Sequence, residues 1–158
     1  MREIRKKSRA IGIHEAENLL ARCEYGVLST TDNNGQPYCT PLNYVYKNNC
    51  IYFHCAHAGH KIDNIESNPK VSFCAVGAAN VIPSEFRTDY ESVVAFGIAS
   101  EAEGAERHKA LVFLLEKYSP EFVAEGKIYI DQMDGVTKVI KIEINHISGK
   151  IAQAKLNE

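Results

Sequence analysis

Two stretches rich in β-forming residues, 26–31 and 37–46, are separated by the cluster Asp32-Asn33-Asn34-Gly35, and this spacing constrains the fold more than any other feature. Asp, Asn and Gly tolerate the positive φ angles of tight hairpin turns. A second turn, at 47–49, leads into another β-rich run at 50–55. The sequence therefore predicts three consecutive antiparallel strands.

Periodicity and turn residues predict the remaining elements. Apolar residues at i, i+3, i+4 and i+7 predict one helix over 14–24 and another from about 105 to 118. A short helix is expected over 60–68, because the next residue is Pro69. Three further strands are expected over 70–76, 92–102 and 137–147, with an irregular loop over 77–91 and a short helical patch over 122–133.

Strands outnumber helices in this order and are joined largely by tight turns, which favours a small antiparallel barrel with peripheral helices. The chain has 158 residues, of which 45% are hydrophobic and 24% charged, as expected of one globular domain over 1–158. The basic segment 1–12 is expected to be a flexible or loosely packed arm.

The charge balance bears on the partners of the chain. With 18 Lys and Arg against 20 Asp and Glu, the net charge of −2 does not favour nucleic acid as a partner. No apolar run follows the basic arm or approaches the length of a membrane span, and five scattered cysteines without a C-x-x-C pair suit reduced thiols. We expect a cytoplasmic protein that does not bind membranes.

The segment 53–61 carries the densest cluster of reactive side chains. His54, His57 and His60, with Cys55 among them, offer imidazole and thiolate ligands that suit zinc. However, the segment passes from strand through loop into helix, and no acidic or cysteine partner stands nearby at a recognised spacing. Because bare spacing is weak evidence, we expect no intrinsic metal site.

The same segment is better suited to bind an anion. Gly59 lets the backbone turn tightly, and His60 and Lys61 begin a helix whose exposed N–H groups and positive end favour a phosphate. The alternative is that Gly59 is only a turn and Lys61 a solvated surface lysine. Spacing alone does not separate these two interpretations.

Four segments, in this order, resemble the FMN-binding split-barrel superfamily of pyridoxamine 5'-phosphate oxidase-like proteins. They are Tyr-Gly-Val-Leu-Ser-Thr-Thr at 25–31, the run from Asn-Gly-Gln-Pro to Tyr-Val-Tyr at 34–46, Ile-Tyr-Phe-His-Cys-Ala at 51–56, and His-Lys-Ile-Asp-Asn-Ile to Ser-Phe at 60–73. Segments 90–97 and 138–150 also resemble the nitroimidazole-resistance, nitroreductase-like branch. The implied fold is a six-stranded antiparallel split β-barrel, mainly β (α+β), with peripheral helices.

The resemblance also implies a homodimer that binds two FMN molecules in clefts between its subunits. The family strand that runs beside the flavin ring matches Thr40, Pro41, Leu42, Asn43 and Tyr44. The family's Tyr-Thr pair matches His54 and Cys55, followed by Ala56, and its Ser-Arg-Lys phosphate triplet matches Gly59, His60 and Lys61.

The sequence departs from the family's oxidases at the phosphate ligands. Only Lys61 of the triplet is retained, and Thr40 stands where those oxidases carry an arginine for the phosphate. Segment 151–158 has no arginine to hold a substrate phosphate, which argues against oxidation of vitamin B6. The expected activity is instead FMN-dependent reduction of small electrophiles such as nitroaromatic compounds, with NAD(P)H as electron donor, because the cofactor supplies the redox chemistry.

His54 is the candidate catalytic residue, since an imidazole near the flavin can orient a nitro or carbonyl group or donate a proton. The alternative is a hydrogen-bonded barrel histidine without a role in turnover. Two other functions compete with the reductase: a haem-binding or haem-degrading protein that uses the three histidines as axial ligands, and a flavin-binding protein without turnover. For Glu85, Arg87 and Asp89, a solvated loop competes with a substrate clamp.

Overall fold

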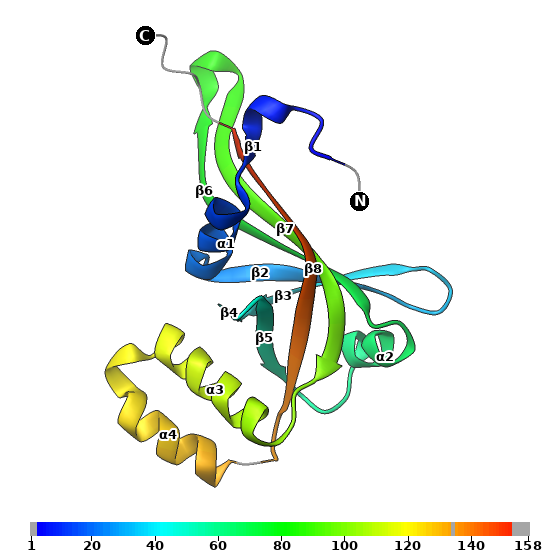
Figure 1. Ribbon diagram of the computed structural model, residues 1–158, viewed down its shortest axis with the longest axis vertical. Helices are drawn as coiled ribbons and strands as arrows, with labels where there is room; N and C mark the ends of the chain where they lie inside the picture. The colour runs from blue at the N-terminus through cyan, green and yellow to red at the C-terminus, as the bar shows by residue number, and fades with distance from the viewer. Residues whose placement is uncertain (1–2, 134, 153–158) are drawn as a thin grey trace.

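The computed structural model describes residues 3–133 and 135–152, in which eight strands form one antiparallel sheet (Figure 1). The order is β3-β2-β6-β7-β8-β5-β4, and β1 pairs with β8. The strands are β1 (Ala10–Ile11), β2 (Tyr25–Thr31), β3 (Pro37–Asn43), β4 (Val45–Lys47), β5 (Cys50–Cys55), β6 (Lys70–Ile82), β7 (Arg87–Glu101) and β8 (Lys138–Ala152). The helices are α1 (Ile13–Arg22), α2 (His60–Ser67), α3 (Gly104–Tyr118) and α4 (Val123–Gln132).

The two ends of the sheet belong to one continuous segment of chain. Only Tyr44 separates β3 from β4, yet β3 ends the sheet order on one side and β4 ends it on the other. No ladder joins β3 to β5 in the described residues, so the sheet curls without closing. This arrangement confirms the predicted α+β fold of a split antiparallel barrel.

Eight strands are observed where six were predicted, because the run 37–46 breaks at Tyr44 and a short N-terminal strand was not foreseen. That strand, β1, pairs Ala10 with Lys150 and Ile11 with Gly149, so the end of the basic arm is held in the sheet. Helix α3 begins at Gly104, close to the predicted start.

The prediction of an irregular loop over 77–91 was wrong. Strand β6 continues to Ile82, the turn Pro83–Glu85 follows, and β7 begins at Arg87. A bulge between Val76 and Ala79 accommodates Gly77 without ending the pairing. The result is a hairpin arm that extends beyond the barrel (Figure 1).

Ion pairs and hydrogen bonds hold this arm. Glu91 accepts hydrogen bonds from the side chain of Arg22 in α1 and from the backbone N–H of Ala78 in the bulge. Near the tip, Arg87 donates to Glu85 at 2.8 Å and to Asp89 at 2.6 Å. These three side chains therefore pair with one another rather than lying free in a solvated loop.

The core fills the barrel with the inward residues of the strands. Its largest fully buried side chains are Tyr44, Phe53, Phe73, Leu19, Leu20, Leu28, Ile51, Ile142, Val93, Val139 and Thr30. Helix α1 covers the sheet at β7 and β8 with Ala16, Leu19 and Leu20, as its periodicity predicted. Helix α2 buries Ile62, Asn64 and Ile65. Among the described helices, none has the length and apolar character needed to cross a bilayer.

Candidate functional site

Helix α2 begins with the open turn that an anion site needs. Gly59 has a φ of +134°, and a Cβ built there would meet no heavy atom within 4 Å. The following residues, His60 and Lys61, form the first turn of the helix. Lys61 is half-buried and forms no ion pair with a carboxylate among the described residues. The positive helix end and the ammonium group together favour an anion here.

An aromatic contact fixes this first turn against strand β3. The imidazole of His60 stacks on the ring of Tyr38, with 4.1 Å between the ring centroids and 25° between the planes. Nearby, Asp32 accepts hydrogen bonds from the backbone N–H groups of Gln36 and Asn34, which lower the pKa of its carboxyl. His60 contributes to this lowering, so the carboxylate lies within electrostatic reach of the imidazole.

Strand β3 presents an open edge and a buried polar group. In the described residues it pairs only with β2, so no strand ladder occupies its other edge. On the partly buried side of the strand, between Tyr38 and Leu42, the hydroxyl oxygen of Thr40 is shielded from solvent and has no hydrogen-bond partner among the described residues. A buried polar group without a partner calls for a ligand or water, because leaving it unsatisfied is costly.

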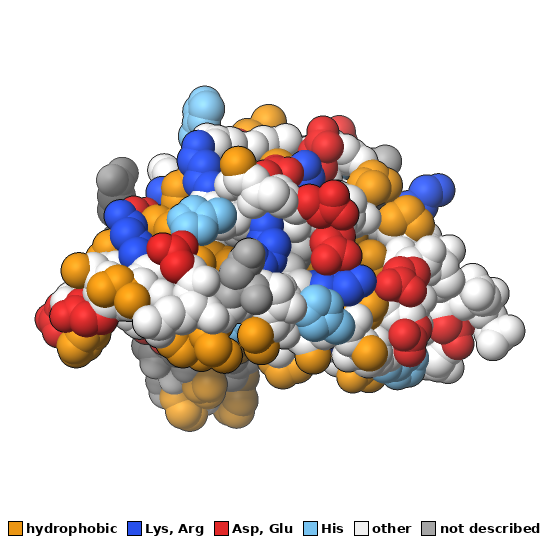
Figure 2. Space-filling model, turned by 90° about the horizontal axis from the view of Figure 1, so that it is seen from below, with side chains coloured by type: hydrophobic (Ala, Val, Ile, Leu, Met, Phe, Trp, Pro, Cys, Tyr) orange, Lys and Arg blue, Asp and Glu red, His pale blue; other side chains and the backbone are white. Residues whose placement is uncertain are grey.

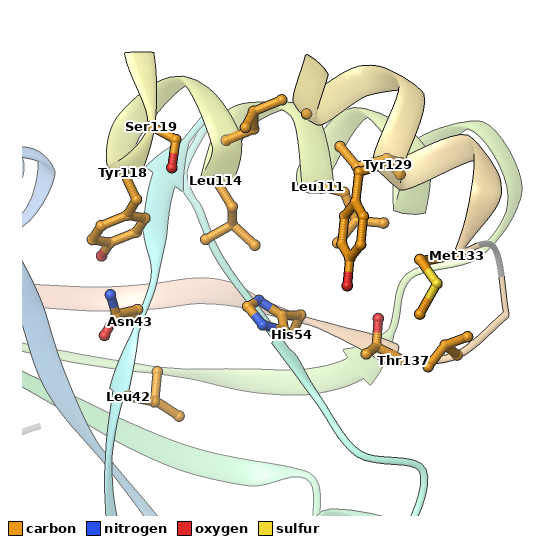
Figure 3. A pocket seen from close by; sticks show the side chains of 14 residues that line it. Leu42, Asn43, His54, Leu111, Leu114, Tyr118, Ser119, Tyr129, Met133 and Thr137 are labelled. Carbon is orange, nitrogen blue, oxygen red and sulfur yellow. The ribbon is translucent and has the colours of Figure 1, made fainter. Parts of the chain in front are cut away.

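At the far end of β3 a pocket of about 570 Å³ lies between the barrel and the helices α3 and α4 (Figure 3). Its barrel wall comes from β3 and β5. The opposite wall comes from α3, α4 and, between α4 and β8, Met133, Val136 and Thr137. The pocket is lined by Leu42, Asn43, His54, Leu111, Leu114, Leu115, Tyr118, Ser119, Gly126, Tyr129, Ile130, Met133, Val136 and Thr137. None of these lining residues is Lys, Arg, Asp or Glu.

Two polar side chains face each other across this pocket. His54 projects from β5 toward the helices, and the hydroxyl of Tyr129 points from α4 toward the barrel (Figure 3). Neither side chain makes a hydrogen bond with a residue that the structure describes. Both groups are therefore available to a ligand, as hydrogen-bond donors or acceptors.

The structure brings some of the predicted residues together and separates others. Leu42, Asn43 and His54 line the pocket, whereas Gly59, His60 and Lys61 lie beside the other end of β3. Pro41 is exposed, and Ala56 lies in the exposed loop after β5.

The side chain of Tyr44, one of the residues expected beside the flavin, lies in the core. It is 0% exposed, its hydroxyl donates to the carbonyl oxygen of Leu20 at 2.5 Å, and its ring centroid lies 4.6 Å from that of Phe73. Cys55 is also buried, and burial raises the pKa of its thiol against the opposing charges of Lys61 and Lys138. It is therefore a packed thiol rather than a nucleophile.

The three histidines of the segment 53–61 do not converge. His54 faces the pocket, His60 stacks on Tyr38, and Nε2 of His57 lies 2.8 Å from the carbonyl oxygen of Gly135. Within the described part of the chain, no group of three or more His, Cys, Asp or Glu is placed to hold a metal ion.

The helical wall of the pocket was not predicted from the sequence. Its residues come from α3 and α4, more than fifty positions after His54. The one signal was that 122–133 carries apolar residues, such as Ile128, Tyr129 and Ile130, that do not fall into a single helical stripe.

The antiparallel sheet that curls without closing, with helices around it, defines a split-barrel protein. Residues 13–151 match the model of the family described as pyridoxamine 5'-phosphate oxidase, and the chain belongs to this family. The predicted recognition is therefore confirmed at the level of the family. No curated protein matches the chain.

Solved structures share the fold at low sequence identity. One is described as a 5-nitroimidazole antibiotic resistance protein from Bacteroides thetaiotaomicron, with a TM-score of 0.71, 22% identity and coverage of 90% of this chain and 86% of that chain. A conserved hypothetical protein from Mycobacterium tuberculosis has a TM-score of 0.78 and 20% identity, covering 99% and 98%. An FAD- and haem-binding protein from Mycobacterium smegmatis has a TM-score of 0.74 and 14% identity, covering 90% and 72%.

Proposed function

We propose that this protein is an FMN-dependent oxidoreductase that reduces small electrophiles such as nitroaromatic compounds, with NAD(P)H as donor. The observation that carries the proposal is the buried hydroxyl of Thr40, without a partner among the described residues. It lies on the edge strand that the open turn of α2 adjoins. The family membership and a solved structure of the same fold that binds FAD and haem support a flavin cofactor.

Residues of this chain fit three parts of the FMN molecule: its phosphate, the polar groups between phosphate and ring, and the edge of the ring. Lys61 and the N–H groups of the first turn of α2 would hold the phosphate, with His60 beside them. The hydroxyl of Thr40 would bind a polar group between the phosphate and the ring, and the free backbone edge of β3 would pair with the polar edge of the ring. Bound FMN supplies hydride and electron transfer. His54, which is free of other hydrogen bonds, would orient the acceptor and donate a proton.

We further propose that the site is completed in a homodimer. The outward face of the central strands carries Val94, Phe96 and Ile98 on β7 and Cys74 and Val76 on β6, all at least partly exposed. A sheet face that carries several partly exposed apolar side chains suits a two-fold partner.

Flavin content and turnover test the proposal together. The purified protein, or the apoprotein after addition of FMN, is expected to show bound-flavin absorption bands and to oxidise NAD(P)H anaerobically when a nitroaromatic acceptor is present. Lack of FMN binding at micromolar concentrations contradicts the proposal. FMN binding without NAD(P)H oxidation on a panel of nitro and quinone acceptors supports a flavin-binding protein without turnover instead.

One observation favours haem as a second candidate ligand. The imidazole of His54 projects without a hydrogen-bond partner into an apolar pocket that also contains the thioether of Met133, and His and Met are both axial haem ligands. A relative of the same fold binds FAD and haem. A Soret band that forms on addition of haem and is lost in His54→Ala would support this function. An unchanged band in His54→Ala would contradict it.

A further inference from the structure

Helix α4 forms one wall of the pocket and packs mainly on α3 and on the turn that precedes it. None of its side chains is fully buried. Gly126 allows the close approach to α3, because a Cβ there would lie 2.3 Å from the side chain of Leu115. Tyr129, Ile130 and Met133 instead line the pocket. The apolar side of α4 therefore faces space that a ligand can fill.

The electrostatic character of the pocket restricts that ligand. None of its lining residues is Lys, Arg, Asp or Glu, and most are aliphatic or aromatic. Charged side chains of both signs are interspersed on the surface around this end of the molecule (Figure 2). An anionic ligand would lose its hydration without gaining a cation in the pocket, which is costly. An uncharged ligand loses much less hydration free energy when it enters the pocket.

The polar groups further define the ligand. His54 and Tyr129 approach from opposite walls, and both are free to hydrogen-bond (Figure 3). A volume of about 570 Å³ lies in the usual range for pockets that hold small organic molecules. A flat aromatic compound with a hydrogen-bond acceptor at each of two edges satisfies both groups while its ring covers the leucines of α3.

We infer that this pocket binds uncharged aromatic carbonyl compounds of the quinone class, which are then the preferred acceptors of the reaction. Only the redox step of this inference rests on the proposed function. Binding of the ligand in the pocket does not depend on it. Conversion of a quinone to its hydroquinone takes up one hydride, supplied from NAD(P)H through the flavin, and one proton from solvent, which the imidazole of His54 is placed to pass on to a carbonyl oxygen.

Binding of two probes with the same ring tests the charge requirement. The full-length protein is titrated with 1-naphthol, which is uncharged, and with naphthalene-1-sulfonate, which is an anion, and heats of binding are measured. We expect 1-naphthol to bind at least tenfold more tightly. Equal affinity, or tighter binding of the sulfonate, overturns the inference.

Two variants, one in α4 and one at the residue that follows α4, locate the probe. Met133→Trp fills the pocket and is expected to weaken 1-naphthol binding at least tenfold, whereas Ile128→Trp, at a position that is 59% exposed and does not line the pocket, leaves it unchanged. Tyr129→Phe is expected to weaken binding several-fold through loss of one hydrogen bond. No effect of Met133→Trp places the probe elsewhere and overturns the inference.

FMN retention separates failure of the inference from failure of the proposed function. If the parent protein binds FMN but not 1-naphthol, the inference is wrong and the flavin site stands. If it binds 1-naphthol but not FMN, the pocket stands and the proposed function is wrong. If FMN and 1-naphthol displace each other, the flavin ring itself occupies the pocket, and the inference is overturned.

Discussion

The phenolic oxygen of Tyr118 accepts a hydrogen bond from the backbone N–H of Tyr44 at 2.9 Å, which connects the end of α3 to the point where β3 becomes β4. The same hydroxyl lies 2.8 Å from the carbonyl oxygen of Tyr44. The neighbouring Lys117 donates to the carbonyl oxygens of Cys23 and Tyr44, and its ammonium lies 4.2 Å from the centroid of the Tyr44 ring. One end of the helical wall is thus fixed to the strand junction.

Tyr118→Phe is expected to destabilise the fold. Burial raises the pKa of the phenol, so the hydroxyl stays protonated, and its removal leaves the N–H of the buried Tyr44 without this partner. The expected loss in the free energy of unfolding is about 1–3 kcal/mol, measured by urea denaturation. The matched control is Tyr129→Phe, whose hydroxyl has no partner among the described residues and whose loss should cost less than about 0.5 kcal/mol. Equal effects of the two variants would contradict this account.

Lys61→Ala should weaken FMN retention without affecting the fold. A charge-assisted contact to a phosphate contributes roughly 1.5–3 kcal/mol, so the dissociation constant should rise by about one to two orders of magnitude. Quenching of flavin fluorescence measures the affinity. Lys127→Ala, on the exposed side of α4, is the control and should bind FMN like the parent. If Lys61→Ala also binds like the parent, the phosphate lies elsewhere.

Thr40→Val should have opposite effects on folding and on binding. Replacing the buried hydroxyl, which has no partner among the described residues, with a methyl group removes a desolvation penalty, so the apoprotein should gain about 1 kcal/mol in its free energy of unfolding. FMN affinity should fall several-fold, because the ligand loses a polar contact. Urea denaturation measures the free energy of unfolding, and a parallel FMN titration measures the affinity. A variant that is less stable and binds FMN equally well would show that Thr40 serves the fold alone.

The stability contributed by Glu91 should depend on pH. The hydrogen bonds from Arg22 and from the N–H of Ala78 lower the pKa of this carboxyl in the folded state. Its contribution is therefore complete above the unfolded pKa of about 4.3 and is lost as the pH falls through the lowered folded value. At pH 7, Glu91→Gln should be less stable by about 1 kcal/mol, because the pair is partly exposed. Urea denaturation from pH 7 to pH 3 should show this difference disappearing; a constant difference would contradict the ion-pair explanation.

The sequence predicted the strands and α1 well, because alternation and a single helical stripe follow directly from which side each residue buries. It failed where tertiary contacts override local signals. An irregular loop was expected over 77–91, but a bulge stands there instead, stabilised by Glu91 and its distant partner Arg22. The break at Tyr44 was missed because the anchors of this residue, Leu20 and Tyr118, lie in other elements.

The candidate site also has one part that the sequence predicted and one part that it did not. Resemblance to the family located β3 and the first turn of α2, where the backbone conformation of Gly59 and the charge of Lys61 are local properties. The opposing wall, with Leu111 and Tyr129, depends on how α3 and α4 fold back over β5, which local periodicity does not encode.

The position of β8 in the sheet has a consequence for folding. It follows every other strand in the chain, yet it pairs with β7, β5 and β1 and so joins the two halves of the sheet. Until residues 138–152 are synthesised, β5 and β7 each have a long unpaired edge. Nascent chains therefore hold exposed strand edges through most of translation. Folding has to wait for non-local pairings, which are slow to form and open to aggregation until they do.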